Sequence, residues 1–270
     1  MKNVTRTNPF SDLKFSSRLL FKNYKPFLKM QLFAIALTLI IFFIIIGIGF
    51  VYRVIFNREV NEPVRYIIGA FISIFGGFIT VFLSTSNGLA VDLIDSGDEF
   101  TEFRNAFRYF GKFWWQYFLV TIIVFGFPHA VQGFFTEPRI RDIIQGASWE
   151  KFMIYEAIGL IISYIWYSLF MCVYPSLTVQ GNLKHAFTEN FRILKNGSSR
   201  VFGTWAIFFL VFQVPTYIFA SLTLIFHASP FGIFWVLFML LNLFVGTPLQ
   251  YLVAAGMYFN IPFERFKPLD

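Results

Sequence analysis

The sequence predicts an all-α, polytopic integral membrane protein, and two observations carry this prediction. Hydrophobic residues make up 57% of the 270 residues and charged residues only 14%, whereas soluble domains have about 25% charged residues. Long stretches contain no Lys, Arg, Asp or Glu, and their residues do not alternate between polar and apolar. Because every backbone N–H and C=O must be paired inside lipid, such stretches predict transmembrane helices rather than barrel strands.

These stretches divide into six predicted transmembrane helices within one membrane domain, residues 1–270. A helix needs about 20 residues to cross about 30 Å of hydrocarbon. The final uncharged stretch, 201–263, has 63 residues and is long enough for two helices that meet at 227–230. The predicted spans are 30–52, 66–90, 113–136, 154–179, 201–226 and 231–257. A long basic leader, with no small-x-small site after Phe50, favours a retained first helix over a cleaved signal peptide.

Basic residues predict the orientation of these helices. Sixteen of the 22 Lys and Arg residues fall in the two terminal segments and in the connections after the second and fourth spans. Cytoplasmic loops are enriched in Lys and Arg, so both termini are predicted in the cytoplasm and the protein in the cytoplasmic (inner) membrane. The net charge of +7 follows from this bias. Nucleic acid is not a predicted partner, since no recognition motif accompanies the charge.

Three cytoplasmic segments are predicted to be amphipathic helices that lie in the membrane interface, at 11–28, 98–112 and 182–196. Each precedes a helical hairpin and carries basic residues on one face and apolar residues on another. Ser96 with Glu99 has capping-box spacing for the second segment, and Asn182 can cap the third. The basic residues predicted to contact anionic head groups are Lys14, Arg18, Lys22, Lys25, Lys29, Arg104, Arg108, Lys112, Lys184, Arg192 and Lys195.

The three segments also share short stretches of sequence. Ala106-Phe107 matches Ala186-Phe187, and Arg18-Leu19-Leu20 is similar to Arg192-Ile193-Leu194. This similarity suggests a unit of one interfacial helix and one hairpin that is repeated three times. The general enrichment of basic residues in cytoplasmic loops would place similar segments there without any repeat, so both explanations stay open.

The third segment and the span before it resemble a known family. The resemblance rests on Tyr174-Pro175-Ser176-Leu177-Thr178-Val179, Leu183-Lys184-His185-Ala186-Phe187 and Phe191-Arg192-Ile193-Leu194-Lys195-Asn196. These stretches look like the six-helix membrane domain of glycerophosphodiester phosphodiesterases and related stand-alone membrane families of unknown function. The resemblance covers about a third of the chain and implies a membrane module linked to lipids. Phosphodiesterase activity is not implied, because the chain has no room for the soluble barrel.

Few side chains in the spans are suited to chemistry. Cys172 is the single cysteine, and the three histidines share no ligand spacing. No P-loop, nucleophile-elbow or zinc-protease motif occurs, so no catalytic residue, cofactor or metal is predicted. The acidic group from Asp92 to Glu102 fits the start of a helix better than a cation site. Glu156 is the one acidic candidate in a span, and it lies five residues after Lys151, about 7 Å of helix rise and therefore near the interface.

Small residues and prolines predict how the spans pack. Gly69, Ser73 and Gly77 form a small-xxx-small row, which predicts close helix contact within the bundle or between subunits. Pro215 and Pro248 lie deepest in their spans and predict helix kinks. Such kinks serve packing in most membrane helices and build binding sites in some transporters.

Together these features favour a non-enzymatic, multi-pass membrane protein that interacts with lipids or forms a module of a membrane complex. The predicted partners are anionic head groups on the cytoplasmic side, together with a protein partner in the membrane or a cytoplasmic ATPase. The permease subunit of a transporter, such as an ABC-type exporter, is an alternative, because an N-terminal interfacial helix and six spans suit it. An assembly scaffold is a third possibility.

Overall fold

The computed structural model describes residues 8–56, 62–96, 102–128, 130, 149–226 and 229–261, and these ranges contain helices and no strand. The prediction of an all-α protein is therefore confirmed for them. Five helical stretches are apolar and long enough to cross a bilayer: Tyr24–Val51, Ile74–Asp95, Ala157–Gln180, Leu183–Thr223 and Pro230–Asn260. The predicted span 113–136 reaches beyond the described residues, so the count of six stays a prediction.

The first third of the chain contains four helices. Their bounds are α1 Pro9–Lys22, α2 Tyr24–Phe56, α3 Glu62–Ser84 and α4 Ser86–Asp95. The predicted interfacial helix 11–28 is shorter in the structure, because Asn23 separates α1 from α2. The predicted span 66–90 is likewise interrupted at Thr85.

The middle third contains α5 Arg104–Thr121, the π-helix η1 Ile122–Gly126, α7 Trp149–Phe170 and α8 Val173–Gln180. The predicted interfacial segment 98–112 is not a separate helix here, since α5 continues from Arg104 into the predicted third span. Ser96, which was predicted to start that segment, is instead the C-cap of α4, and its backbone N–H donates to the Asp92 carbonyl. The predicted span 154–179 is interrupted between α7 and α8.

The last third contains α9 Leu183–Phe208, the π-helix η2 Phe209–Gln213, α10 Val214–Phe226, α11 Ser229–Leu241, the π-helix η3 Asn242–Gly246 and α12 Thr247–Asn260. The predicted cap of α9 is confirmed, because the Asn182 side chain accepts a hydrogen bond from the Lys184 N–H at 2.9 Å. Helix α9 joins the predicted interfacial segment 182–196 to the next span. Gly197, with φ −146° and ψ 31°, marks a kink at the junction.

Each of the three π-helical segments ends two residues before a proline. Pro128 follows η1, Pro215 follows η2 and Pro248 follows η3. A proline ring clashes with the carbonyl four residues earlier in an α-helix and has no N–H to donate to it. The wider π turn moves that carbonyl away. The helices thus depart from regular α geometry next to Pro215 and Pro248, where the sequence predicts kinks.

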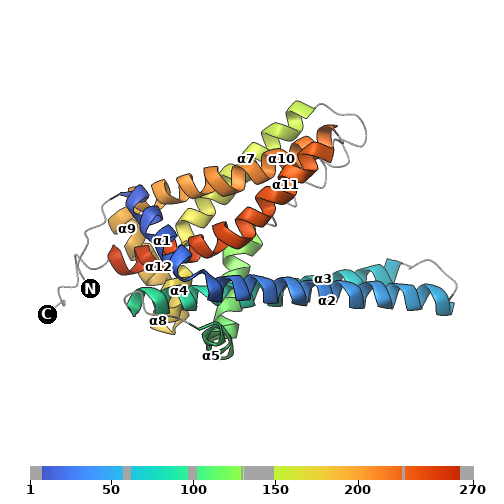
Figure 1. Cartoon of the computed structure of the whole chain (residues 1–270), viewed down its shortest axis with the longest axis horizontal. Coiled ribbons are helices and arrows are strands. Elements are labelled where there is room, and N and C mark those ends of the chain that lie inside the picture. Colours follow the sequence, from blue (N-terminus) through green and yellow to red (C-terminus); the bar gives the residue numbers. More distant parts are fainter. Residues whose placement is uncertain are drawn as a thin grey trace.

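Three short helices, α4, α8 and α12, contact one another at one end of the molecule, and we call them the hub (Figure 1). Each is the last described helix of one third of the chain. Leu89 and Leu93 of α4, Leu177 of α8 and Leu252 of α12 are all 0% exposed. Apolar packing between the three thirds of the chain therefore concentrates in the hub.

The longer helices leave the hub as arms (Figure 1). Helices α2 and α3 form one arm, and α10 and α11 lie beside each other in another. In the most apolar part of Tyr24–Val51 only 6% of the residues are buried, against 56% in Ile74–Asp95, which ends in the hub. Uncovered apolar surface of this extent is costly in water and favourable in lipid. The arms thus have the surface expected of membrane-spanning helices.

Candidate lipid head-group interface

Helix α1 is anchored on the protein by one of its faces. The Asn8 side chain accepts the Ser11 N–H at 2.9 Å and Pro9 occupies the first turn, which together form a favourable helix start. Leu19 and Leu20 are each 3% exposed and belong to the main apolar core, and α1 packs against α12 and α9. Its orientation is therefore determined by the protein rather than by the membrane alone.

The opposite side of α1 carries the predicted basic residues. Lys14, Arg18 and Lys22 are exposed, as are Lys25 and Lys29. The last two belong to α2, because Asn23 ends α1. The predicted basic stripe is thus divided between two helices, although all five of its members reach the surface.

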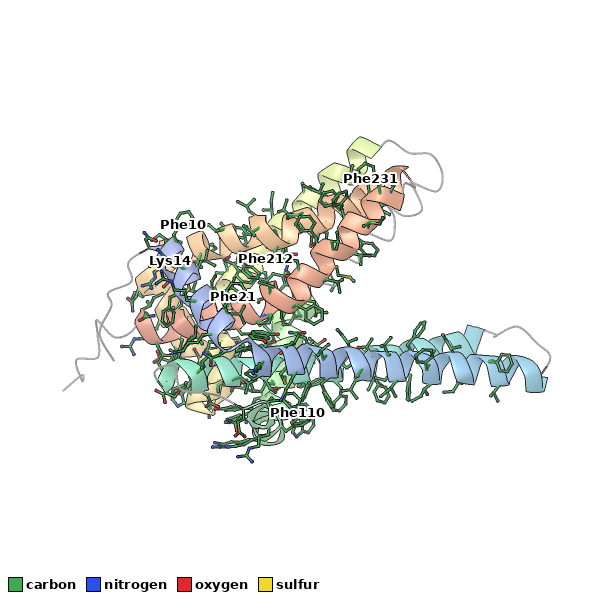
Figure 2. All side chains as sticks on the ribbon, viewed as in Figure 1. Phe10, Lys14, Phe21, Phe110, Phe212 and Phe231 are labelled. Atoms are coloured by element: carbon green, nitrogen blue, oxygen red, sulfur yellow. The ribbon has the colours of Figure 1, made fainter. Side chains whose placement is uncertain are left out.

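Large aromatic side chains accompany these basic residues. Phe10 and Phe21 are each 69% exposed and Tyr24 is 48% exposed. Figure 2 shows Phe10, Lys14 and Phe21 along α1, at the hub end of the molecule. Aromatic and basic side chains together are typical of helices at the membrane surface, where rings enter the boundary of the acyl chains and cations meet phosphate.

Helix α5 repeats this combination. Arg104, Arg108 and Lys112 are exposed, as predicted. They are accompanied by partly exposed rings: Phe107 at 42%, Trp114 at 44% and Trp115 at 52%. Tryptophan is enriched at the boundary between membrane and water. Basic residues in the first half of α5 and tryptophans in its middle are therefore consistent with a helix that enters the membrane near residues 114–115.

The third basic segment, at the start of α9, has one cation that is less exposed than the others. Lys184 and Lys195 are exposed, whereas Arg192 is only partly exposed and pairs with Glu189 at 3.3 Å. A neighbouring carboxylate offsets part of the charge that Arg192 can offer to an anion. The structure therefore leaves Lys184 and Lys195 as the more available cations of this segment.

An ion pair that the sequence reasoning missed connects α1 to α9. Asp12 is 2% exposed and accepts two hydrogen bonds from the Arg200 guanidinium, the Nε bond at 2.6 Å. A two-pronged arginine–carboxylate pair is among the stronger polar contacts in proteins. Arg200 was counted only as a cytoplasmic positive charge. The signal that pointed to its partner was an acidic residue on the buried face of an otherwise basic helix.

A second missed contact joins α4 to α5. The Tyr109 hydroxyl donates to the Asp92 carboxylate, which also accepts from the Asn105 amide at 3.4 Å. Burial, followed by the Asp92 hydrogen bond, raises the pKa of Tyr109 above its usual value of 10. The hydroxyl therefore stays a donor at neutral pH. Asp92, part of the acidic group in the sequence, thus serves a structural contact here, while Asp98 and Glu99 lie outside the described residues.

Buried polar contacts also secure the hub. The Tyr117 hydroxyl of α5 lies 2.6 Å from the Thr178 hydroxyl of α8. Asn190 of α9 hydrogen-bonds to the backbone on both sides of the break between α7 and α8. Its side chain accepts from the Cys172 N–H at 3.1 Å and donates to the Leu169 carbonyl at 2.7 Å. Interhelical hydrogen bonds of this kind hold membrane helices together where apolar burial gives little drive.

The small-residue row on α3 would leave room for added side-chain atoms at its two glycines. A Cβ built on Gly69 or Gly77 would meet no heavy atom within 4 Å. The side chains of Ser73 and Glu156 lie outside the described residues. Close contact through this row therefore stays a prediction.

No family model matches the sequence, and no curated protein or solved structure matches it. The resemblance to the membrane domain of glycerophosphodiester phosphodiesterases therefore stays a prediction. Among the described residues no three His, Cys, Asp or Glu side chains gather as metal ligands do. The candidate site is therefore the surface around the hub, where exposed cations and aromatic rings occur together.

Proposed function

We propose that this protein is a non-enzymatic, multi-pass module of the cytoplasmic membrane that binds anionic lipid head groups on its cytoplasmic side. The observation that carries the proposal is the division of α1 into a buried face, with Leu19 and Leu20, and an exposed face with Lys14, Arg18 and Lys22. The protein holds the buried face of the helix, and the exposed face presents its positive charge to the surroundings.

Anionic lipid is the partner that this surface suits best. The exposed rings Phe10, Phe21 and Tyr24 would be unfavourable beside a hydrated acidic protein, but they fit the boundary between head groups and acyl chains. Each Lys or Arg near an anionic surface contributes about 1 kcal/mol. The five basic residues of α1 and α2 therefore supply enough attraction to enrich anionic lipid around the hub.

Lipid preference measured on the full-length protein tests this proposal. The variant replaces Lys14, Arg18, Lys22, Lys25 and Lys29 with Gln in nanodiscs that mix phosphatidylglycerol and phosphatidylcholine. Native mass spectrometry of the retained lipids should show the preference for phosphatidylglycerol reduced roughly tenfold or more. Retention of the wild-type preference would contradict the proposal.

A variant with the same loss of charge on the predicted outer side is the control. It replaces Arg53, Arg58, Arg65, Arg139 and Arg141 with Gln, so the net charge falls equally. We expect it to keep most of the preference of the wild type. Equal loss in both variants would mean that total charge, rather than the hub surface, determines lipid binding.

A further inference from the structure

One buried side chain in the membrane part of the molecule has an unmet capacity for hydrogen bonds. Gln31 of α2 is 1% exposed, and neither its Nε2 nor its Oε1 has a hydrogen-bond partner. Burial of an amide without partners costs roughly 2–7 kcal/mol, depending on the reference state. Thr38, the next polar residue on α2, shows the ordinary solution, since its hydroxyl donates to the Ala34 carbonyl at 2.8 Å. Gln31 is thus an exception that calls for a ligand.

The helices that contact α2 carry two more buried polar atoms without partners. Helix α2 packs against both α4 and η3. Ser86, the first residue of α4, is 0% exposed and its Oγ is unpaired. Asn242, the first residue of η3, has a buried and unpaired Oδ1. In Figure 1 the first turns of α2 run beside the region where α11 passes into α12.

The packing of α2 on α3 shows the height along the helices at which Gln31 lies. The rings of Phe33 and Phe82 are 5.1 Å apart, between helices that run in opposite directions. Gln31 precedes Phe33 by two residues, so it lies at the height of the residues just after Phe82, where α3 ends and α4 begins. Its side chain points away from Phe33 and shares the buried face of α2 with Phe27 and Met30, which pack in one core with Leu89 of α4 and Val245 of η3.

Gly246 leaves the space that the Asn242 amide occupies. A Cβ at Gly246 would lie 2.5 Å from Asn242 Oδ1 and 2.9 Å from the Phe212 ring. The side chain of Asn242 therefore lies against the backbone of η3. This position is available because η3 ends in glycine, and π-helical segments are frequent at functional sites.

The unpaired atoms determine which chemistry can bind. Gln31 Oε1 and Asn242 Oδ1 only accept hydrogen bonds, Gln31 Nε2 only donates, and the Ser86 hydroxyl does both. An anion would face two acceptors and a cation would face the amide N–H groups. An uncharged hydroxyl both donates and accepts, so it complements the whole set.

We propose that Gln31, Ser86 and Asn242 form a binding site for an uncharged hydroxyl group between α2, α4 and η3. Water and the glycerol part of a lipid head group share this chemistry. The site uses none of the exposed basic residues, so its failure would leave the proposed binding of anionic lipid untouched.

Stability in defined lipid tests the site. The full-length protein is placed in nanodiscs of phosphatidylcholine, which has no head-group hydroxyl, or of phosphatidylglycerol, which has two. Thermal unfolding is followed by tryptophan fluorescence for Gln31→Leu, Asn242→Leu and the double variant. Leucine fills a similar volume without polar atoms. If the site is occupied, each single change should lower the midpoint by several degrees, and the double change should lower it by less than the sum.

The lipid comparison identifies the source of the hydroxyl. A lower midpoint in both lipids indicates water, and a lower midpoint in phosphatidylglycerol alone indicates the lipid head group. Thr38→Val, which removes a polar group already bonded within α2, is the control and should change the midpoint little. An unchanged or raised midpoint for Gln31→Leu in both lipids would overturn the proposal, because removal of an unpaired buried amide stabilises a protein.

Discussion

At the residue scale, the contact between Asp12 and Arg200 shows how a charged pair can be useful inside an apolar environment. The two residues are 188 positions apart and join the first described helix to α9. Removing one member of a buried pair leaves an uncompensated charge, whereas replacing both with apolar residues of similar volume is often neutral. The pair is therefore more important for how α1 is positioned than for total stability.

This distinction gives a prediction. Asp12→Ala should lower the free energy of unfolding by about 3 kcal/mol, because the Arg200 guanidinium loses its partner. The double variant Asp12→Leu/Arg200→Met should recover most of that loss. Denaturation in detergent micelles measures both, with the exposed Lys14→Ala as the control for α1. Equal stability of wild type and Asp12→Ala would show that the pair contributes nothing measurable.

At the scale of helices, composition predicts where the helices lie better than it predicts where they are interrupted. Uncharged apolar stretches predict where helices lie, since a span must be apolar over its whole length. They do not predict the interruptions at Thr85 and between α7 and α8, because these depend on partners far away in the sequence, such as Asn190. The capping prediction at Asn182 is confirmed because a cap is a local contact, whereas Ser96 closes a helix instead of starting one.

The same limit applies to the candidate site. Exposure of the five basic residues of α1 and α2 could be predicted from helical spacing, since residues three and four apart share a face. Gln31 was seen in the sequence only as one residue of an uncharged stretch. Its unpaired amide is visible only when the neighbouring helices are in place. Buried polar sites of this kind depend on three-dimensional packing rather than on a local pattern.

Contact between α4 and α5 gives a prediction at this scale. A Cβ on Gly88 would lie 2.3 Å from the Tyr109 ring, so Gly88→Ala should displace Tyr109 from Asp92. We expect a loss of about 1–3 kcal/mol of stability, the usual cost of overpacking. Thermal unfolding of the purified protein measures this.

Gly111→Ala on α5 is the matched control for Gly88→Ala. A Cβ there meets nothing within 4 Å, and alanine favours an exposed helix by up to about 1 kcal/mol over glycine. Gly111→Ala should therefore leave the midpoint unchanged or raise it. A Gly88→Ala protein as stable as Gly111→Ala would show that the contact with Tyr109 adjusts freely.

At the scale of the whole molecule, the prediction concerns which ends of the helices share a side of the membrane. The single native cysteine, Cys172, is 1% exposed, so new cysteines can be labelled in its presence. Lys14→Cys and Lys195→Cys should react with a membrane-impermeant maleimide from the cytoplasmic side. Asn61→Cys, Ser148→Cys and Ala228→Cys, in the predicted connections after the first, third and fifth spans, should react only from the other side. Labelling of Lys14→Cys and Asn61→Cys from the same side would invalidate the predicted topology.

The contact of α1 with α12 also has a consequence for how the protein is made. Translation proceeds from the N-terminus, so α1 leaves the ribosome long before α12. At that stage the surface of α12 on which α1 packs has not yet been made. Until the C-terminal helices have been inserted, Leu19 and Leu20 must be removed from water by another apolar surface. The membrane interface is the nearest apolar environment, and a helix with basic and aromatic side chains is suited to bind there. The exposed basic and aromatic side chains of α1 would then have a second role, during membrane insertion.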